Sequence, residues 1–398
     1  MKEIRKYAAV MPALVILTIT LLPGPGAAQS DTGGYYVGTK HVISSKILNE
    51  DRPVYINLPK AYDLLDDSYP VCYLLDAEIH YEYAAGMISY LGGMGRIPEM
   101  IVVGIPSLHR ARDMTPVAIV DDTSGYYTAA GGGDNFLKFI TDELDPYITS
   151  AYRTAPFRIV FGHCLAGMFA VHATLNQPDW FNACIAISPA LWYADDYVIS
   201  LLDSTLTDYD PSKLLYVTMG TGEDSLTLAA YGRLQTVLDS RTPAGLHYRF
   251  NELAGESHMS LTVQSLINGL DWLYASWNFI PDTGEVTTEM VTDKCKNLSE
   301  YYGYRIVPPE KVVNRLGYHY YNQKDYDRAR SLFTLNQKHH PNSLNTHDSM
   351  GEVCEILGDY EIALTHYRRA LQLSDDSGNG YHDFFERKIQ RVREKMNE

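Results

Sequence analysis

Short runs of consecutive apolar residues recur through the first two thirds of the chain. Runs of this length, bounded by turn residues, are typical of strands buried on both faces of a sheet. The strand-like runs are 54–59, 71–76, 100–106, 158–163, 183–188, 213–220 and 247–253, and helical segments between them include 134–152, 165–175 and 260–277. This alternation predicts an α/β domain with a doubly wound, mostly parallel sheet, and the first strands are candidates for an antiparallel edge.

The last part of the chain follows a different pattern, with a period of 34 residues. Small residues and aromatic residues recur at this offset, in the pairs Gly317 and Gly351, Ala329 and Ala363, and Phe333 and Tyr367. The period and the residue types are those of tetratricopeptide repeats, which are pairs of packed helices. Two repeats and a final charged helix at 381–396 make a short stack, so we expect it to pack on a preceding helix or on the α/β domain.

The N-terminus has the features of a secretory signal peptide. Basic residues in MKEIRK precede the apolar run AAVMPALVILTITLL, and small residues follow up to Ala28. The apolar run is too short for a comfortable membrane span. We therefore expect cleavage after Ala28, export to the periplasm or the medium, and no stable membrane span in the mature protein.

Composition excludes several classes of function. The 398 residues carry a formal net charge of −16 and no long basic run, which argues against a nucleic-acid partner. The five cysteines are too few and too scattered for a disulfide framework, and no CxxC motif suggests a zinc site. His339, His340 and His347 fall at a helix end and turn of the repeat pattern, so no metal and no other cofactor is expected.

The stretch FGHCLAGMFA, residues 161–170, is the most informative in the chain. A buried strand turns there into a helix, and Gly162, Ala166 and Gly167 supply the small side chains that a tight turn needs. Cys164 would lie at the helix N-terminus, where the dipole and the free N–H groups favour a thiolate. The backbone N–H of Leu165 would point to the same place and could bind an oxyanion.

A nucleophile at this turn requires an acid and a histidine further along the chain. His258 lies between a strand and a helix, where the fold needs the base, and Glu223 and Asp224 follow the strand at 213–220. We favour Glu223 as the acid and keep Asp224 as the alternative. A second oxyanion donor is expected after the strand at 71–76, with Ala77 and Glu78 as candidates.

These motifs together resemble the putative esterase family of α/β-hydrolases, the group with enterochelin (siderophore) esterases, S-formylglutathione hydrolase and feruloyl esterases. The matching stretches are YLLDAE, VVGIPSLHRARDMTP, GGGDNFLKFITDELDPYI, GHCLAG, ISPALWY, GTGED and GESHMSL. The family elbow resembles G-H-S-x-G-G, so Cys164 replaces the serine and Ala166 replaces a glycine. The resemblance implies catalytic roles for Cys164, His258 and Glu223.

The resemblance also implies further residues of the site. Arg112 and Asp113 of the RARDMTP stretch would line or brace it, and Trp192 would border the pocket. Asp76 and His163, beside the oxyanion loop and the nucleophile, are further candidates for substrate binding. The expected organisation is a signal peptide at 1–28, an α/β-hydrolase domain at 29–283, a linker with one helix at 284–309, and tetratricopeptide-like repeats at 310–398.

The expected activity is carboxylic-ester hydrolysis by a triad of nucleophile, histidine and acid. Cysteine in place of serine leaves three interpretations open: a thiol-dependent esterase, lactonase or thioesterase; a serine-type enzyme weakened by the replacement; or a binding protein that works through its repeats. The substrate could be a siderophore, a sugar or aryl ester, or a thioester. The repeats could bind a protein or peptide partner, or serve as a lid or a dimer contact.

Overall fold

The computed structural model describes residues 37–398, except for 120–128, 177–179, 210–211, 280–284 and 379. The expected signal peptide at 1–28 lies outside the described residues. Within the described part of the chain, no helix combines the length and the apolar character that a membrane span needs.

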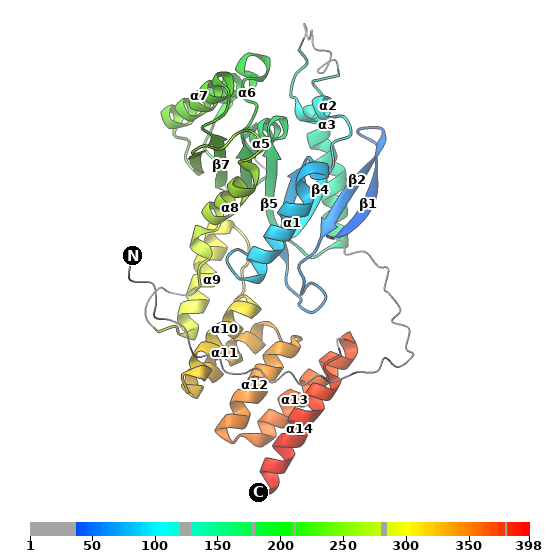
Figure 1. Cartoon of the computed structure of the whole chain (residues 1–398), viewed down its shortest axis with the longest axis vertical. Coiled ribbons are helices and arrows are strands. Elements are labelled where there is room, and N and C mark those ends of the chain that lie inside the picture. Colours follow the sequence, from blue (N-terminus) through cyan, green and yellow to red (C-terminus); the bar gives the residue numbers. More distant parts are fainter. Residues whose placement is uncertain (1–36, 120–128, 177–179, 210–211, 280–284, 379) are drawn as a thin grey trace, which may run out of the picture. The chain divides into compact units, whose positions relative to one another are not determined.

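Eight strands form a single mixed sheet in the order β1-β2-β4-β3-β5-β6-β7-β8 (Figure 1). β1 and β2 pair antiparallel, β2 also runs antiparallel to β4, and the remaining strands are parallel. The predicted mostly parallel sheet with an antiparallel edge is therefore confirmed. The strands are β1 Thr39–Ser45, β2 Glu50–Asn57, β3 Tyr69–Leu75, β4 Ile101–Ile105, β5 Thr154–His163, β6 Ala183–Ile187, β7 Lys213–Gly220 and β8 Leu246–Leu253.

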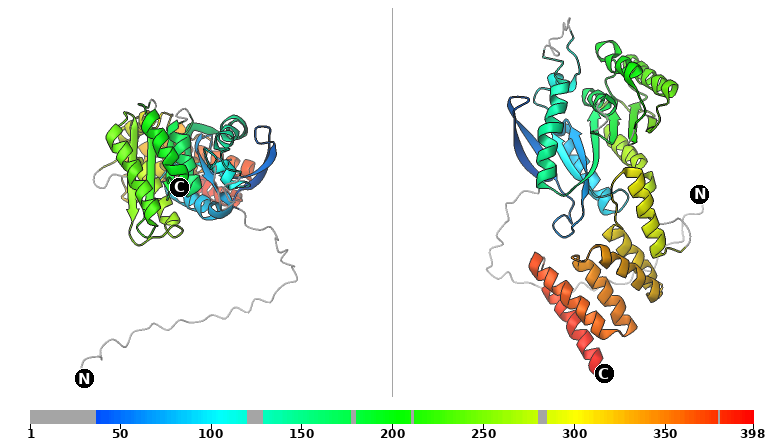
Figure 2. Two further views of the ribbon diagram at one scale, coloured as in Figure 1. Left: turned by 90° about the horizontal axis from the view of Figure 1, so that it is seen from above. Right: turned by 180° about the vertical axis from the view of Figure 1, so that it is seen from behind.

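Helices cover both faces of the sheet, as its continuous apolar strands require. One core cluster joins the sheet to α1 (Ala77–Gly93) and α8 (Thr262–Leu273). A second cluster joins the opposite face of the sheet to α5, α6 and α7 and to the predicted helix at 134–152. The right-hand view of Figure 2 shows these helices from behind. That predicted helix consists of α3 (Gly133–Lys138), the π-helical η1 (Phe139–Leu144) and α4 (Asp145–Ala151). The other helices on this face are α5 Leu165–Asn176, α6 Tyr193–Thr205 and α7 Ser225–Arg241. The short α2 spans Arg110–Met114.

The C-terminal part is all-helical. α10 pairs with α11 and α12 pairs with α13, and α14 packs on α13. A Cβ atom at Gly317 would lie 2.2 Å from the Phe333 ring, and one at Gly351 would lie 2.4 Å from the Tyr367 ring. The same close approach thus recurs at the 34-residue offset. The helices are α10 Glu310–Asn322, α11 Tyr326–His339, α12 Leu344–Leu357, α13 Tyr360–Ser377 and α14 His382–Asn397.

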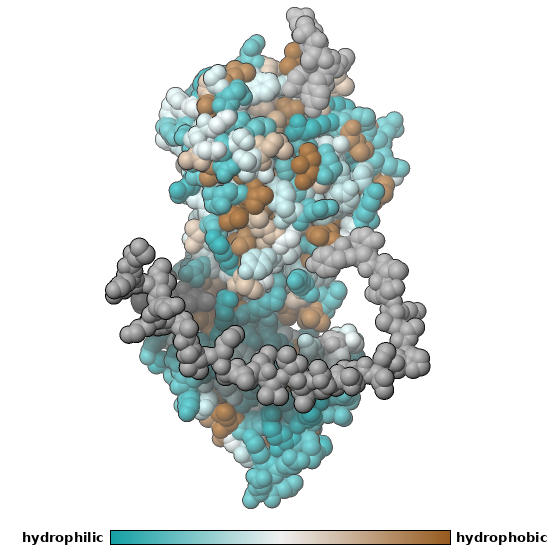
Figure 3. Space-filling view, in the orientation of Figure 1, coloured by the Kyte–Doolittle hydropathy of each residue, from teal (hydrophilic) through white to brown (hydrophobic). Residues whose placement is uncertain are grey.

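The final helix, α14, is amphipathic, with one apolar face and one charged face. Phe385, Ile389 and Val392 are buried against the stack. Its other residues are largely charged, and the surface over α14 in Figure 3 is mainly hydrophilic. A helix of this kind closes the core of a short stack and leaves a solvated outer face.

The helical region shares a core with the sheet domain. The predicted linker contains α9 (Thr288–Tyr302), and one continuous apolar cluster runs from α1 and α8 through α9 into α10–α14. The Tyr302 hydroxyl donates to the Leu273 carbonyl at 2.7 Å, and Lys311 forms an ion pair with Glu99 at 2.7 Å. The residues from Val37 onward accordingly form one compact unit.

Replacement of Gly317 by alanine should destabilise this unit. The added methyl group would overlap the buried Phe333 ring, and overpacking of this kind costs about 1–3 kcal/mol of unfolding free energy. Gly232, an exposed helical glycine of α7, is the matched control, because no atom lies within 4 Å of the place that an added methyl group would take. Gly232→Ala should leave the protein unchanged or slightly more stable. Chemical denaturation of both variants is the measurement, and equal midpoints would contradict the packing argument.

Candidate active site

The turn between β5 and α5 holds Cys164 in a left-handed backbone conformation, with a φ of +60° (Figure 1). A Cβ atom at Gly162 would lie 2.1 Å from the Ala166 carbonyl oxygen, so only glycine fits there. The Cys164 N–H donates to the Ile187 carbonyl at 3.0 Å, which ties the turn to the end of β6. This strained turn presents the thiol above the carboxyl ends of the parallel strands.

The predicted base and acid lie side by side at the same edge of the sheet. His258 follows β8, and its Nδ1 atom is 3.1 Å from each carboxylate oxygen of Glu223. A Cβ atom at Gly220 would lie 2.3 Å from the Glu256 carbonyl oxygen, so this glycine lets the His258 loop approach the end of β7. The side chain of Glu223 is only 3% exposed, which protects its interaction with the imidazole from water.

The structure separates the two candidate acids. Asp224 is the N-cap of α7, and its carboxylate accepts hydrogen bonds from the backbone N–H groups of Leu226 and Thr227 at 2.9 and 3.0 Å. Its side chain is thus engaged with its own helix, while Glu223 contacts His258. Of the two alternatives, the geometry favours Glu223.

Ser188 is part of this arrangement and was missed in the sequence. Its hydroxyl donates to Glu223 and also lies 3.0 Å from Nδ1 of His258. The residue is fully buried and has a φ of +40° at the end of β6. The stretch ISPALWY drew attention to Trp192, and nothing in its pattern singled out the serine. Trp192 itself is half-buried against the second core cluster.

His163, one of the predicted substrate-binding residues, is buried next to His258. Its ring is 4% exposed, and its Nε2 lies 2.8 Å from the His258 carbonyl oxygen. Because a carbonyl can only accept, Nε2 carries the proton and donates it. Burial, followed by the neighbouring His258, lowers the pKa of His163 to about 3, so the ring stays neutral. It positions the backbone of His258 from beneath.

Asp76, another predicted substrate-binding residue, is buried and held by several hydrogen bonds. It is 1% exposed and accepts hydrogen bonds from the Ser107 hydroxyl at 2.5 Å and from Nε and Nη2 of Arg110 at 2.9 and 2.8 Å. Arg110 also donates to the His163 carbonyl at 3.2 Å. The carboxylate therefore holds the end of β3, the start of α2 and the nucleophile turn together.

Arg112, which was expected to line or brace the site, takes part in an ion cluster. It forms ion pairs with Glu50 at 2.6 Å and with Asp113 at 2.7 Å. Asp113 also forms an ion pair with Arg52 at 2.9 Å. This buried ion cluster fastens α2 to β2, which is a bracing role. Arg110, two residues earlier, is the arginine near the nucleophile. The sequence HRARD offered two arginines, and only the path of the short helix α2 decided between them.

The thiol of Cys164 has the electrostatic surroundings of a thiolate. Burial acts to raise its pKa, but the hydrogen bond with His258 and the charge of Arg110 outweigh burial, so that the pKa of Cys164 lies below its usual value. The same hydrogen bond to Cys164 raises the pKa of His258 against the effect of burial. Opposite shifts of this kind favour a thiolate–imidazolium pair.

Of the predicted oxyanion donors, the Leu165 N–H is the one that contacts the thiol of Cys164. The Leu165 N–H lies close enough to the sulfur to lower the pKa of Cys164. Ala77 and Glu78 begin α1, where the first N–H groups of a helix have no partner within the helix. The Glu78 carboxylate accepts from the Ser107 N–H at 2.9 Å, which leaves its backbone as the oxyanion candidate. The assignment of these donors stays a prediction.

The pH dependence of thiol alkylation should report the pairing of Cys164 with His258. In the parent, the rate of iodoacetamide labelling should rise with an inflection below the usual thiol pKa of about 8.5. In His258→Ala the inflection should move upward, because burial then acts on the thiol without the hydrogen bond that opposes it. Cys164→Ser is the control, since the other four cysteines are buried. An unchanged inflection in His258→Ala would contradict the pairing.

Comparisons with known proteins match this chain to esterases. The family described as "Putative esterase" matches residues 45–260, which is 216 of the 398 residues. The ferri-bacillibactin esterase BesA of Bacillus subtilis is 28% identical over 252 residues, covering 55% of this chain and 83% of that protein. The siderophore triacetylfusarinine C esterase of Aspergillus fumigatus is 25% identical over 250 residues, covering 53% and 83%.

Solved structures extend the likeness. An IroE-like serine hydrolase from Shewanella oneidensis superposes with a TM-score of 0.67 at 26% identity, covering 75% of this chain and 99% of that one. An uncharacterised protein from Capnocytophaga ochracea, with a TM-score of 0.58 at 20% identity, covers 89% of this chain and 99% of its own, and it shares the fold. With the family matching more than half of its length, the chain belongs to the putative esterase family.

Proposed function

We propose that this protein is an exported carboxylic-ester hydrolase in which Cys164 is the nucleophile, His258 the general base and acid, and Glu223 the residue that orients His258. The observation that carries the proposal is the continuous line of contacts from Glu223 through His258 to the thiol at a strained turn. Ester hydrolysis is the chemistry of the family to which the chain belongs.

The arrangement supports a two-step mechanism. The Cys164 thiolate attacks the ester carbonyl carbon, and the carbonyl oxygen takes up the negative charge near the Leu165 N–H and the start of α1. His258 gives its proton to the departing alcohol, which leaves a thioester on Cys164. A water molecule, deprotonated by His258, then attacks the thioester and releases the acid and the thiolate. Glu223 stabilises the imidazolium in each step.

The curated relatives favour a siderophore ester as the substrate class. The two relatives described above carry names that refer to bacillibactin and triacetylfusarinine C, and both are called esterases. A siderophore ester is therefore our first choice, ahead of a sugar or aryl ester or a thioester. The side chain of His258 is 39% exposed, so a substrate can reach it from solvent.

The proposed location rests on the N-terminal sequence alone. The basic, apolar and small-residue segments up to Ala28 are those of an export signal, which would place the enzyme in the periplasm or outside the cell. A protein or peptide partner of the helical region stays a prediction of its repeat pattern.

Hydrolysis of p-nitrophenyl acetate tests the nucleophile directly. The parent should turn over, and Cys164→Ala and His258→Ala should each lose about 10²–10⁴ in kcat/KM. Cys164→Ser should be slower than the parent, because the surroundings of Cys164 lower the pKa of a thiol. A much faster serine variant would show instead that cysteine weakens a serine-type site. If none of the proteins turned over, the hydrolase proposal would fail and the binding-protein alternative would stand.

The pair of acids supplies a second test with a matched control. Glu223→Gln should lower kcat by about 10²-fold or more, because the neutral amide can no longer stabilise protonated His258. Asp224→Asn should leave kcat within about twofold and reduce stability by no more than about 1 kcal/mol, since an asparagine also caps a helix. The reverse order of the two kcat values would make Asp224 the acid.

A further inference from the structure

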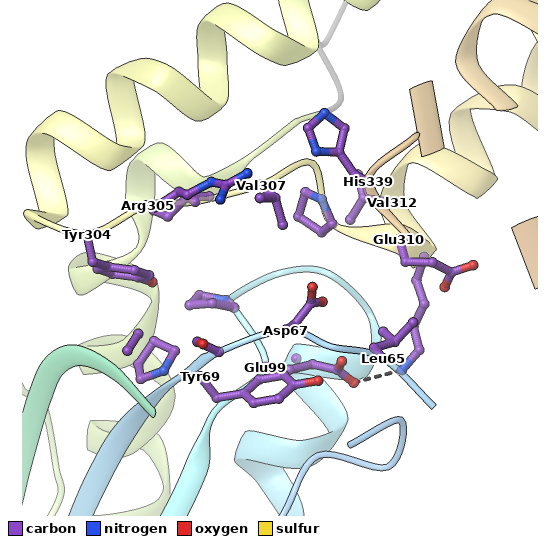
Figure 4. Close-up of a pocket in the computed structure, with 18 of the residues that line it drawn as sticks. Leu65, Asp67, Tyr69, Glu99, Tyr304, Arg305, Val307, Glu310, Val312 and His339 are labelled. Atoms are coloured by element: carbon purple, nitrogen blue, oxygen red, sulfur yellow. Dashed lines mark hydrogen bonds and ion pairs between the residues drawn. The ribbon is translucent and has the colours of Figure 1, made fainter. Parts of the chain in front are cut away.

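A cavity lies at the end of the sheet opposite to Cys164, where the segment leading into α10 meets the N-terminal ends of β3 and β5 (Figure 4). Its volume is about 470 Å³, within the range of about 300–1,000 Å³ that is usual for small-molecule sites. The sheet domain contributes 65–70, 97–99 and 154–156, and the helical side contributes Trp277, 304–307, 309–312, Lys338 and His339.

Both sides of this cavity carry charged side chains. Figure 4 shows Asp67 on the sheet side and Arg305 on the facing segment. The Asp67 carboxylate lies 3.5 Å from Nδ1 of His340, and burial raises the pKa of Asp67 despite that neighbour. Arg305 is exposed and has no hydrogen-bond or ion-pair partner among the residues that the structure describes. A carboxylate and a guanidinium thus face one space without pairing with each other.

Two buried donors also line the cavity. The Tyr69 hydroxyl and the Trp277 indole N–H have no hydrogen-bond partner among the described residues, although the two residues are only 3% and 4% exposed. Buried polar groups of this kind are normally paired. Figure 4 places the Tyr69 hydroxyl beside Glu99, whose carboxylate is held by Lys311 at 2.7 Å. Neither polar atom itself has accessible surface, so both donors lie within the wall of the cavity.

We propose that the cavity binds a small zwitterion of amino-acid or short-peptide type, with its ammonium group at Asp67 and its carboxylate at Arg305. A zwitterion can contact Asp67 and Arg305 at the same time, whereas a simple cation or anion would pair with only one of them. The site is separate from Cys164, and the proposal does not depend on ester hydrolysis.

Isothermal titration calorimetry with triglycine, performed on the full chain, tests this proposal. Triglycine should bind, whereas N-acetyl-triglycine lacks the ammonium group and triglycine amide lacks the carboxylate, and each should bind about tenfold more weakly. Asp67→Asn should weaken triglycine about tenfold and leave N-acetyl-triglycine unchanged. Arg305→Gln should weaken triglycine about tenfold and leave triglycine amide unchanged. This crossed pattern assigns each end of the ligand to one side chain.

Two exposed residues outside the cavity provide matched controls. Asp63→Asn and Arg393→Gln remove the same charges and should leave triglycine binding unchanged. Thermal melting of every variant verifies folding, and Arg305→Gln alters an exposed side chain that carries no packing role, so it remains informative if Asp67→Asn unfolds. Absence of triglycine binding to the folded parent, or binding that neither cavity variant changes, would overturn the proposal.

Discussion

The close approach of two backbone segments at Gly162 is the constraint on which the candidate active site depends. The Ala166 carbonyl lies where any side chain at position 162 would have to be. This contact allows β5 to turn directly into α5, and it forces Cys164 into a left-handed conformation at the turn. The thiol then stands at the N-terminus of a helix, where the helix dipole and the free N–H groups favour negative charge.

The remaining strand ends complete the site around this turn. β6 supplies Ser188, β7 supplies Glu223, and the loop after β8 supplies His258, so the components are far apart in sequence and meet at one edge of the sheet. Buried polar side chains below them fix their positions. His163 holds the His258 backbone, and Asp76 holds Arg110 near the thiol. A buried hydrogen-bond network therefore supports Cys164 and His258 and restricts the movement of their side chains.

The helical region is part of the same folded unit. Its first helices share an apolar core with α1 and α8, and small residues at the repeat offset allow its helices to pack closely. The cavity with Asp67 and Arg305 lies at this junction, at the opposite end of β3 and β5 from the thiol. A repeat stack attached in this way can contribute a wall of a binding site, which an independently hinged module could not do reliably.

The sequence by itself determined the type and order of the elements, because continuous apolar runs, helical spacing and a 34-residue repeat are local patterns. It also indicated Cys164, His258 and Glu223, because glycine-rich turns at strand ends mark the places where this fold presents functional groups. Only the tertiary structure decided which neighbouring side chain reaches the site. Arg110 contacts Asp76 while Arg112 pairs with Glu50, and Glu223 contacts His258 while Asp224 caps α7. Ser188 joins Glu223, and Asp76 and His163 are buried. These choices depend on side-chain direction after a turn and on contacts between distant segments, and neither is encoded in a local pattern.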